Sequence, residues 1–340
     1  MEMTDNRSWI YEALKHSNSV DVPYNFTFTP PALDRLQEHY KCSSVEQFLD
    51  FPIRMSGPNS IKPLYASPDD FGDIARDEFG VGWSTSHIDR GTPLVPCLPE
   101  ASLQNYSFPD PSVEYRFEDL RGWCDENQEH FTVIWVGDLW ERATFMRGMD
   151  KILLDIILHP EFVHELLDGL STYIISTMQI LFESNQFDCI AISDDYGSQR
   201  GMLMSPDHWR EFIKPHLKKI YSVARDNDRI SFHHSCGNIH DIIPDFIELG
   251  LDILHPLQPE AMDIRKVKNE FGDQITLCGG IPTQSVLPDG TPDEVRDEIR
   301  NLKNVMGEAG GYILEPGITV QADVPLENMV AMIEEAKEVA

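Results

Sequence analysis

The stretch Phe232-His233-His234-Ser235-Cys236-Gly237-Asn238 decides how this chain of 340 residues is interpreted. It follows a short apolar run, Arg229-Ile230-Ser231-Phe232, which predicts a buried strand. His234 and Cys236 lie two residues apart at the end of that strand, so their side chains project to the same side. Imidazole and thiolate are the ligand pair that zinc prefers. The stretch therefore predicts part of a zinc site.

A third soft ligand, Cys278, also ends an apolar run, Gln274-Ile275-Thr276-Leu277. Three such ligands and one open coordination position are typical of a catalytic zinc. A small buried residue at a strand end is the alternative interpretation of Cys278. None of the six cysteines forms a CxxC pair, so we do not expect a structural zinc knuckle.

Strands and helices alternate on both sides of this stretch. We expect strands at 23–29, 131–136, 189–193, 229–234, 251–254, 274–278 and 311–314. Helices are expected at 161–183, from 205 onward, at 239–249, 263–271 and 291–306, and from 325 onward. Ser205 and Thr291 are suitable N-caps and Gly250 a suitable C-cap. Repeated βα units predict a parallel sheet, and eight of them close a (β/α)8 TIM barrel. An open doubly wound sheet is the alternative.

One domain is expected to span residues 1–340. Residues 131–340 supply most of the barrel, and 1–130 supply an N-terminal strand, helices and an insertion. Because 40–130 is rich in Pro, Gly and polar residues, we expect helices and loops there, lying over the barrel mouth.

The composition excludes several classes of partner. A net charge of -30 repels nucleic acid and anionic lipid. No apolar stretch reaches membrane-spanning length, and Met1–Arg7 lacks the features of a signal peptide. We therefore expect a cytoplasmic protein with neither a nucleic-acid nor a membrane partner. The sequence leaves the oligomeric state open, a homodimer included.

Polar residues follow the expected strands, where the carboxyl ends of barrel strands form the catalytic rim. These residues are Asp138, Asp194, Asp195, His234, Cys236, His255, Cys278 and Glu315. Asp194 and Asp195 face opposite ways on a strand, so one can enter the site for acid–base work while the other caps a loop. A solvated turn is the alternative for one of them.

The remaining candidates have open roles. Glu315 is a fourth ligand, a general base or an ion-pair partner. Arg200 is suited to bind a substrate anion or to pair with a nearby acid. His255 and Asp138 are expected to line the substrate site at the mouth. No GxSxG, P-loop, HExxH or Rossmann motif occurs, which argues against the enzyme classes that use them.

Several motifs together resemble the uroporphyrinogen decarboxylase superfamily, and more narrowly its corrinoid-dependent methyltransferase branch. They are His234-Ser235-Cys236-Gly237, Gly279-Gly280-Ile281-Pro282-Thr283-Gln284, Leu287-Pro288-Asp289-Gly290-Thr291-Pro292, Pro325-Leu326-Glu327-Asn328, Asp194-Asp195-Tyr196-Gly197 and Met204-Ser205-Pro206. The similarity covers roughly residues 130–340 and is looser over the first 120.

The resemblance implies a (β/α)8 barrel in which an H-x-C motif and a later Cys hold zinc. The zinc lies opposite a cobalamin that a separate corrinoid protein carries, and a methyl group moves between cobalt and a heteroatom. His234 and Cys236 match the H-x-C positions.

This chain departs from the family pattern in two places. Thiol-methylating members carry the later Cys after the last strand, where this chain has Glu315-Pro316-Gly317-Ile318. Cys278 or Glu315 is then the expected replacement ligand. The N-terminal arginine-rich motif of true uroporphyrinogen decarboxylases is also absent, so tetrapyrrole decarboxylation is not expected.

Three functional hypotheses follow. The leading one is zinc-dependent methyl transfer between a small methoxylated or methylated substrate and a corrinoid protein, of the O-demethylase type, with a thiol acceptor as its variant. Zinc would act as a Lewis acid, and Asp195 or Glu315 would position or protonate the departing oxygen. The second is a metal-independent decarboxylase or lyase that uses Arg200. The third is a non-enzymatic module that docks a corrinoid protein.

Overall fold

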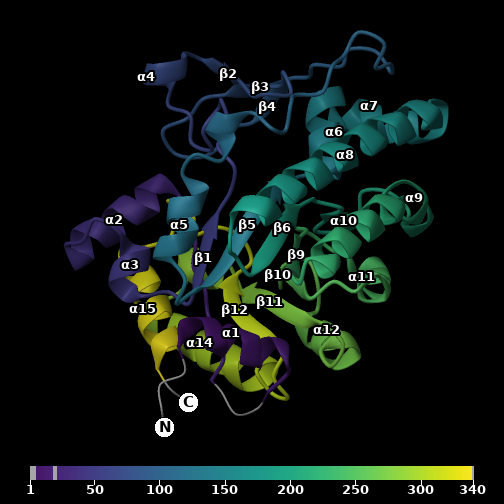
Figure 1. Cartoon of the computed structure of the whole chain (residues 1–340). Coiled ribbons are helices and arrows are strands. Elements are labelled where there is room, and N and C mark those ends of the chain that lie inside the picture. Colours follow the sequence, from purple (N-terminus) through teal and green to yellow (C-terminus); the bar gives the residue numbers. More distant parts are fainter. Residues whose placement is uncertain (1–4, 18–20, 339–340) are drawn as a thin grey trace.

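The fold is a curled parallel sheet surrounded by helices, seen in a computed structural model that describes residues 5–17 and 21–338 (Figure 1). The seven strands run in the order β1-β5-β6-β9-β10-β11-β12, and every neighbouring pair is parallel. Their bounds are Ile53–Ser56, Phe131–Gly137, Cys189–Ser193, Ile230–His234, Ile253–Leu257, Thr276–Ile281 and Tyr312–Pro316.

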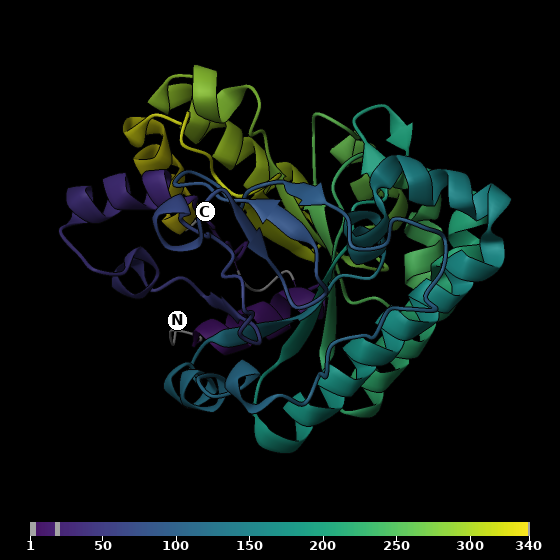
Figure 2. The same ribbon diagram turned by 90° about the horizontal axis from the view of Figure 1, so that it is seen from above.

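The segment 23–29 lies beside β12, where an eighth strand belongs. Isolated parallel bridges join Tyr24 to Leu314 and Phe28 to Val320. Backbone hydrogen bonds of 2.8 to 3.0 Å accompany them. Viewed from above, the helices surround the curled sheet (Figure 2). The prediction of an α/β barrel of the TIM type is confirmed.

The helices follow the sequence signals closely. Thr291 and Glu294 form the complete capping box that begins α14, and Gly250 ends α11 in the left-handed conformation at φ 77°. The helices before β5 are α1 Asn6–Leu14, α2 Pro30–Tyr40, α3 Val45–Leu49, α4 Pro68–Phe71 and α5 Leu120–Glu126. The helices after β5 are α6 Trp140–Arg147, α7 Met149–Leu158, α8 Pro160–Ser184, α9 Pro206–Phe212, α10 Lys214–Asp226, α11 Ile243–Leu249, α12 Ile264–Phe271, α13 Val286–Asp289, α14 Pro292–Met306 and α15 Leu326–Lys337.

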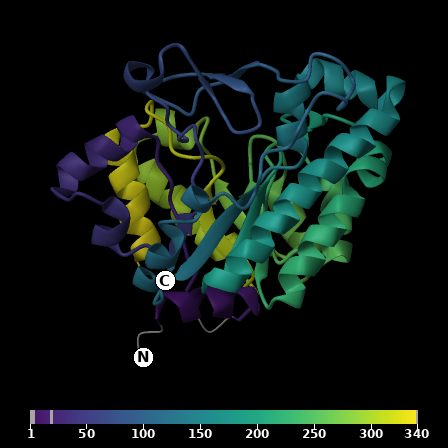
Figure 3. The same cartoon turned by 45° about the horizontal axis from the view of Figure 1, so that its top comes forward.

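Inward-facing side chains fill the lower part of the barrel. They form one apolar cluster, made of Ile10, Ile53, Phe131, Val133, Cys189, Ala191, Phe232, Ile253, Cys278 and Ile313. Ile10 comes from α1, which crosses the lower end of the sheet (Figure 3). Apolar side chains therefore close this end of the barrel. A catalytic site can form only at the opposite end, where the carboxyl ends of the strands lie.

Residues 40–130 contain more regular structure than expected. They include the barrel strand β1 and a three-stranded antiparallel sheet of β2 Ile74–Arg76, β3 Gly82–Ser84 and β4 Pro93–Val95. The expected helices and loops are present, and the strands were not foreseen. The strand β1 was hard to predict because it has only four residues and includes the buried Arg54, whose guanidinium donates to the Phe51 carbonyl at 2.6 Å. The small sheet lies above the barrel as predicted (Figure 1). That 1–340 is one domain stays a prediction.

A short hairpin completes the described secondary structure. A hairpin of β7 Gly197–Ser198 and β8 Gly201–Met202 follows β6. Among the described helices, none combines the length and the apolar character needed to cross a bilayer.

Candidate metal centre

On β9, β10 and β12 the inward face of the strand turns from apolar to polar near the carboxyl end. His234, His255 and Glu315 each lie two residues beyond an apolar inward-facing residue, Phe232, Ile253 and Ile313. His255 is paired in register with His234, and Glu315 lies one strand beyond β11. Because side chains alternate along a strand, all three point into the barrel at its carboxyl end.

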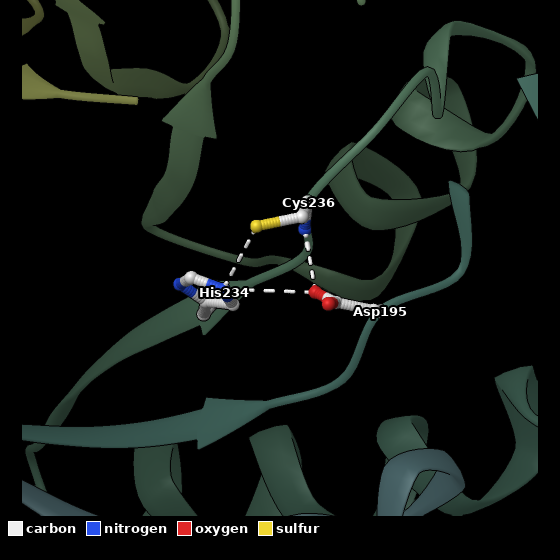
Figure 4. Close-up of side chains that lie close together, drawn as sticks. All are labelled: Asp195, His234 and Cys236. Carbon is white, nitrogen blue, oxygen red and sulfur yellow. Dashed lines mark hydrogen bonds and ion pairs between the residues drawn. The ribbon is translucent and has the colours of Figure 1, made fainter. Parts of the chain in front are cut away.

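His234, Cys236 and Asp195 form what we call the outer cluster (Figure 4). The Cys236 sulfur lies 3.3 Å from His234 Nε2, and the Asp195 carboxylate lies 3.6 Å from the same nitrogen. The Cys236 backbone N–H donates to Asp195 at 2.8 Å. All three side chains are half-buried, and their ligand atoms lie within 4.8 Å of one another. The outer cluster is therefore converged and reachable from the barrel mouth.

Gly237 explains why the motif continues with a glycine. Its φ is +84°, and a Cβ there would lie 2.3 Å from the Gly197 carbonyl carbon. Only glycine adopts that conformation at that distance without strain. The loop after Cys236 thus packs directly on the β7–β8 hairpin.

His255, Cys278 and Glu315 form a second group, which we call the inner cluster. The Cys278 thiol donates to Glu315 Oε2 at 3.1 Å, and His255 Nε2 lies 3.7 Å from the same oxygen. The Asn25 side-chain amide donates to the other carboxylate oxygen at 3.1 Å. All three members are buried. Cys278, expected to join His234 and Cys236, therefore lies in a separate cluster, and Asp195 takes its place.

One hydrogen bond joins the two clusters. His234 Nδ1 and His255 Nδ1 are 2.9 Å apart, so one ring donates and the other accepts. The outer and inner clusters are therefore not independent in their protonation.

Burial shifts the titration of both clusters. It raises the pKa of the Cys236 and Cys278 thiols and lowers the pKa of the His234 and His255 imidazoles. It also raises the pKa of Glu315 to about 7. Neutral imidazoles are ready to bind a metal, whereas the thiols need a metal to become thiolates.

The other predicted residues are spread over the rim. Asp194 is fully buried and accepts the backbone N–H groups of Leu139 and Glu141 at 2.9 Å and the Tyr196 hydroxyl at 2.7 Å. It therefore holds the loop after β5, while its neighbour Asp195 enters the site.

Asp138 and Arg200 lie outside both clusters. Asp138 accepts from the Arg142 guanidinium at 3.2 Å. Arg200 is exposed in the turn of the β7–β8 hairpin. The substrate-binding roles of Asp138, Arg200 and His255 stay predictions.

Glu141 was missed by the sequence analysis. It is buried, accepts from the Ser193 hydroxyl at 2.9 Å and lies 3.7 Å from the Arg90 guanidinium of the extension. Burial and the neighbouring Asp195 carboxylate raise its pKa to about 8. It begins a helix rather than ending a strand, so the strand-end rule passed over it.

The donor chemistry of both clusters suits zinc. Each offers one imidazole nitrogen, one sulfur and one carboxylate oxygen, which are the three donor types of protein zinc sites. The outer cluster lies at the open end of the barrel, so a zinc held there by its three donors would have its fourth position open to a substrate.

Comparisons with known proteins agree with this architecture. A methylcobamide:CoM methyltransferase MtaA of Methanosarcina barkeri is 30% identical over 146 residues, which is 43% of this chain and 40% of that protein. This chain thus matches about two-fifths of that relative's length. A uroporphyrinogen decarboxylase of Pseudoalteromonas atlantica is 24% identical over 278 residues, 78% of this chain and 76% of that protein.

A solved structure and a family profile complete the comparison. The structure of a methyltransferase from Methanosarcina mazei superposes with a TM-score of 0.71 at 20% identity and covers 98% of each chain, which shows the fold. Residues 90–339 match the profile of the uroporphyrinogen decarboxylase (URO-D) family. This span is most of the chain, and the resemblance noted in the motifs is confirmed: the protein belongs to the uroporphyrinogen decarboxylase family.

Proposed function

We propose that this protein is a cytoplasmic, zinc-dependent methyltransferase that moves a methyl group from a small methoxylated or methylated substrate to a corrinoid protein. The observation that carries the proposal is the convergence of His234, Cys236 and Asp195 at the open end of the barrel. The similarity to the methylcobamide:CoM methyltransferase supports methyl transfer and a corrinoid partner.

The residues of the outer cluster divide the work. His234 Nε2, the Cys236 thiolate and an Asp195 oxygen would hold zinc, which when bound supplies a Lewis acid to the heteroatom that carries the methyl group. The two anionic ligands balance the charge of a divalent ion. The Cys236 backbone N–H keeps Asp195 oriented toward the site.

Glu141 is suited to supply the proton. Burial raises the pKa of this carboxyl group to about 8, which favours the protonated form that a general acid needs. Transfer of this proton from the Glu141 carboxyl group to the departing oxygen would complete demethylation. The predicted acid Glu315 lies in the buried inner cluster instead.

The ligand set favours an oxygen-bound methyl group over a thiol acceptor. The outer cluster contains a single sulfur, and Ile318 stands where thiol-methylating relatives are expected to have a second. Each thiolate donates charge to zinc, so one thiolate leaves a stronger Lewis acid than two. A stronger Lewis acid helps an alkoxide or phenoxide leave.

The metal-independent decarboxylase alternative needs free cations at the site. The carboxyl groups Asp195 and Glu141 line this rim, Arg90 faces Glu141 at 3.7 Å, and Arg200 is exposed. An acidic rim suits a metal better than it suits a carboxylate substrate.

The test follows cobalt in the visible spectrum. Zinc-loaded protein, a corrinoid protein reduced to cobalt(I) and a methoxylated aromatic are expected to give methylcobalt(III). His234→Ala and Cys236→Ala should abolish this change, whereas Cys189→Ala, a buried cysteine outside both clusters, should retain it. No spectral change with any methyl donor or acceptor would contradict the proposal.

A further inference from the structure

We propose that the inner cluster is a second metal-binding site, and that it and the outer cluster exclude one another, so that one divalent ion occupies one of two places. The proposal goes beyond the methyl-transfer function, because it concerns His255, Cys278 and Glu315 whether or not the outer cluster is catalytic. The ligand is zinc or another borderline divalent cation.

The first argument is the donor set. The inner cluster repeats the outer one in kind, with one imidazole, one sulfur and one carboxylate, and again all three ligand atoms lie within 4.8 Å of one another. The three donors come from consecutive barrel strands, β10, β11 and β12. Rigid strands hold such atoms in place more firmly than loops do.

The second argument is charge. Glu315 is buried, and no Lys or Arg within residues 5–17 and 21–338 forms an ion pair with it. A buried carboxylate without a cation is costly, and it normally avoids that cost by binding a proton. A divalent ion would replace the missing positive charge, because one carboxylate and one thiolate neutralise it. The bound ion would displace the protons of Cys278 and Glu315 to solvent.

The third argument concerns the hydrogen bond between the two rings. His234 Nδ1 and His255 Nδ1 share one proton across 2.9 Å. When His234 carries that proton, its Nε2 is free for a metal at the outer cluster, and His255 must carry its own proton on Nε2, facing Glu315. When His255 carries the proton, its Nε2 is free for the inner cluster, and His234 Nε2 is blocked.

Mutual exclusion follows from this geometry. Coordination through both Nε2 atoms would leave both Nδ1 atoms protonated and facing each other at hydrogen-bond distance, which is repulsive. The position of a single proton therefore selects the site. Since the outer cluster is half-buried and the inner one is buried, an ion at the inner cluster lies out of reach of a substrate.

The test uses cobalt(II), whose thiolate charge-transfer absorption reports a bound sulfur, together with the metal content of the dialysed protein. Wild type is expected to bind one equivalent. Cys236→Ser should still bind one equivalent and keep a thiolate band, now from Cys278. Cys278→Ser should also bind one and keep the band from Cys236. The double variant should lose the band, and Cys189→Ser, a buried control, should behave as wild type.

Two outcomes would overturn the proposal. Loss of the thiolate band in Cys236→Ser would show that the inner cluster binds no metal, and two equivalents in wild type would show that the sites do not exclude one another. Loss of the band in Cys278→Ser alone would instead remove the outer cluster and the proposed function, and would leave an inner site. If the Cys278→Ser protein does not fold, a variant that combines Cys236→Ser with Glu315→Gln replaces the double cysteine variant. It should bind cobalt(II) at least tenfold more weakly than Cys236→Ser alone.

Discussion

The outer and inner clusters contain the same three kinds of donor and differ in exposure. The outer one is half-buried at the barrel mouth, and the inner one is buried against the apolar filling of the barrel. Because the donors are the same, the difference in exposure to solvent must account for the different roles of the two clusters. At the mouth, the donors can bind a metal and face a substrate. Inside, they form a hydrogen-bonded network that also contributes to stability.

The largest expected effect separates the clusters by activity. Cys236→Ala removes a metal ligand at the barrel mouth and should lower the rate of methyl transfer by more than about 100-fold. Even the loss of a residue that only hydrogen-bonds to a metal ligand typically lowers metal affinity or activity by about 10–100-fold. Cys278→Ala should keep most of the activity. Initial rates of methylcobalt formation measure both. Equal losses in the two variants would merge the clusters into one catalytic unit.

The second prediction tests the connection between the clusters. His255→Ala deprives His234 Nδ1 of its acceptor and should weaken metal binding at the outer cluster by about 10–100-fold. His255→Asn, which retains an acceptor oxygen, should recover part of this loss. Competition against a chelator measures the affinity. An unchanged affinity in His255→Ala would show that the hydrogen bond is not used.

The third prediction concerns stability, for which the inner cluster should matter more than the outer one. Cys278→Ala removes the thiol that donates to Glu315 and should lower the free energy of unfolding by about 1–3 kcal/mol. Cys236→Ala, at a half-buried position, should cost less than half as much. Urea denaturation of the metal-free proteins gives both values. A greater loss in Cys236→Ala would contradict the assignment of stability to the inner cluster.

The fourth prediction is a pH dependence of the inner cluster. Burial raises the pKa of Glu315 from an ordinary 4.5 to about 7, so the folded protein binds this proton more tightly than the unfolded one. Its stabilising contribution is full below pH 4.5 and falls as the pH rises to about 7. Thermal unfolding of metal-free Glu315→Gln should lack this decline. The exposed Glu327→Gln, used as a control, should retain it.

The sequence predicted the barrel and the polar rim because both depend on local patterns. Caps such as Thr291 and period-two alternation around His234 are visible in a single segment. The pairing of donors was less accessible, because it depends on register between strands. Cys278 lies in register with Ile313, one layer below the rim, and that depth separates it from Cys236.

Two further features had no local signal. The strand β1 is four residues long and contains the buried Arg54, so its pattern is not that of a buried strand. Glu141 lies at the beginning of a helix, and only the fold brings it next to Asp195. Both depend on contacts between segments that are distant in the sequence.

The most direct test of the account is the position of the metal. Crystals of the zinc-loaded protein, measured on both sides of the zinc absorption edge, would show it as an anomalous difference peak. We predict a peak bounded by His234 Nε2, the Cys236 sulfur and an Asp195 oxygen. If a second peak appears at the inner cluster, the occupancies of the two peaks should sum to one ion. A fully occupied peak at His255, Cys278 and Glu315 with none at His234 would contradict the account.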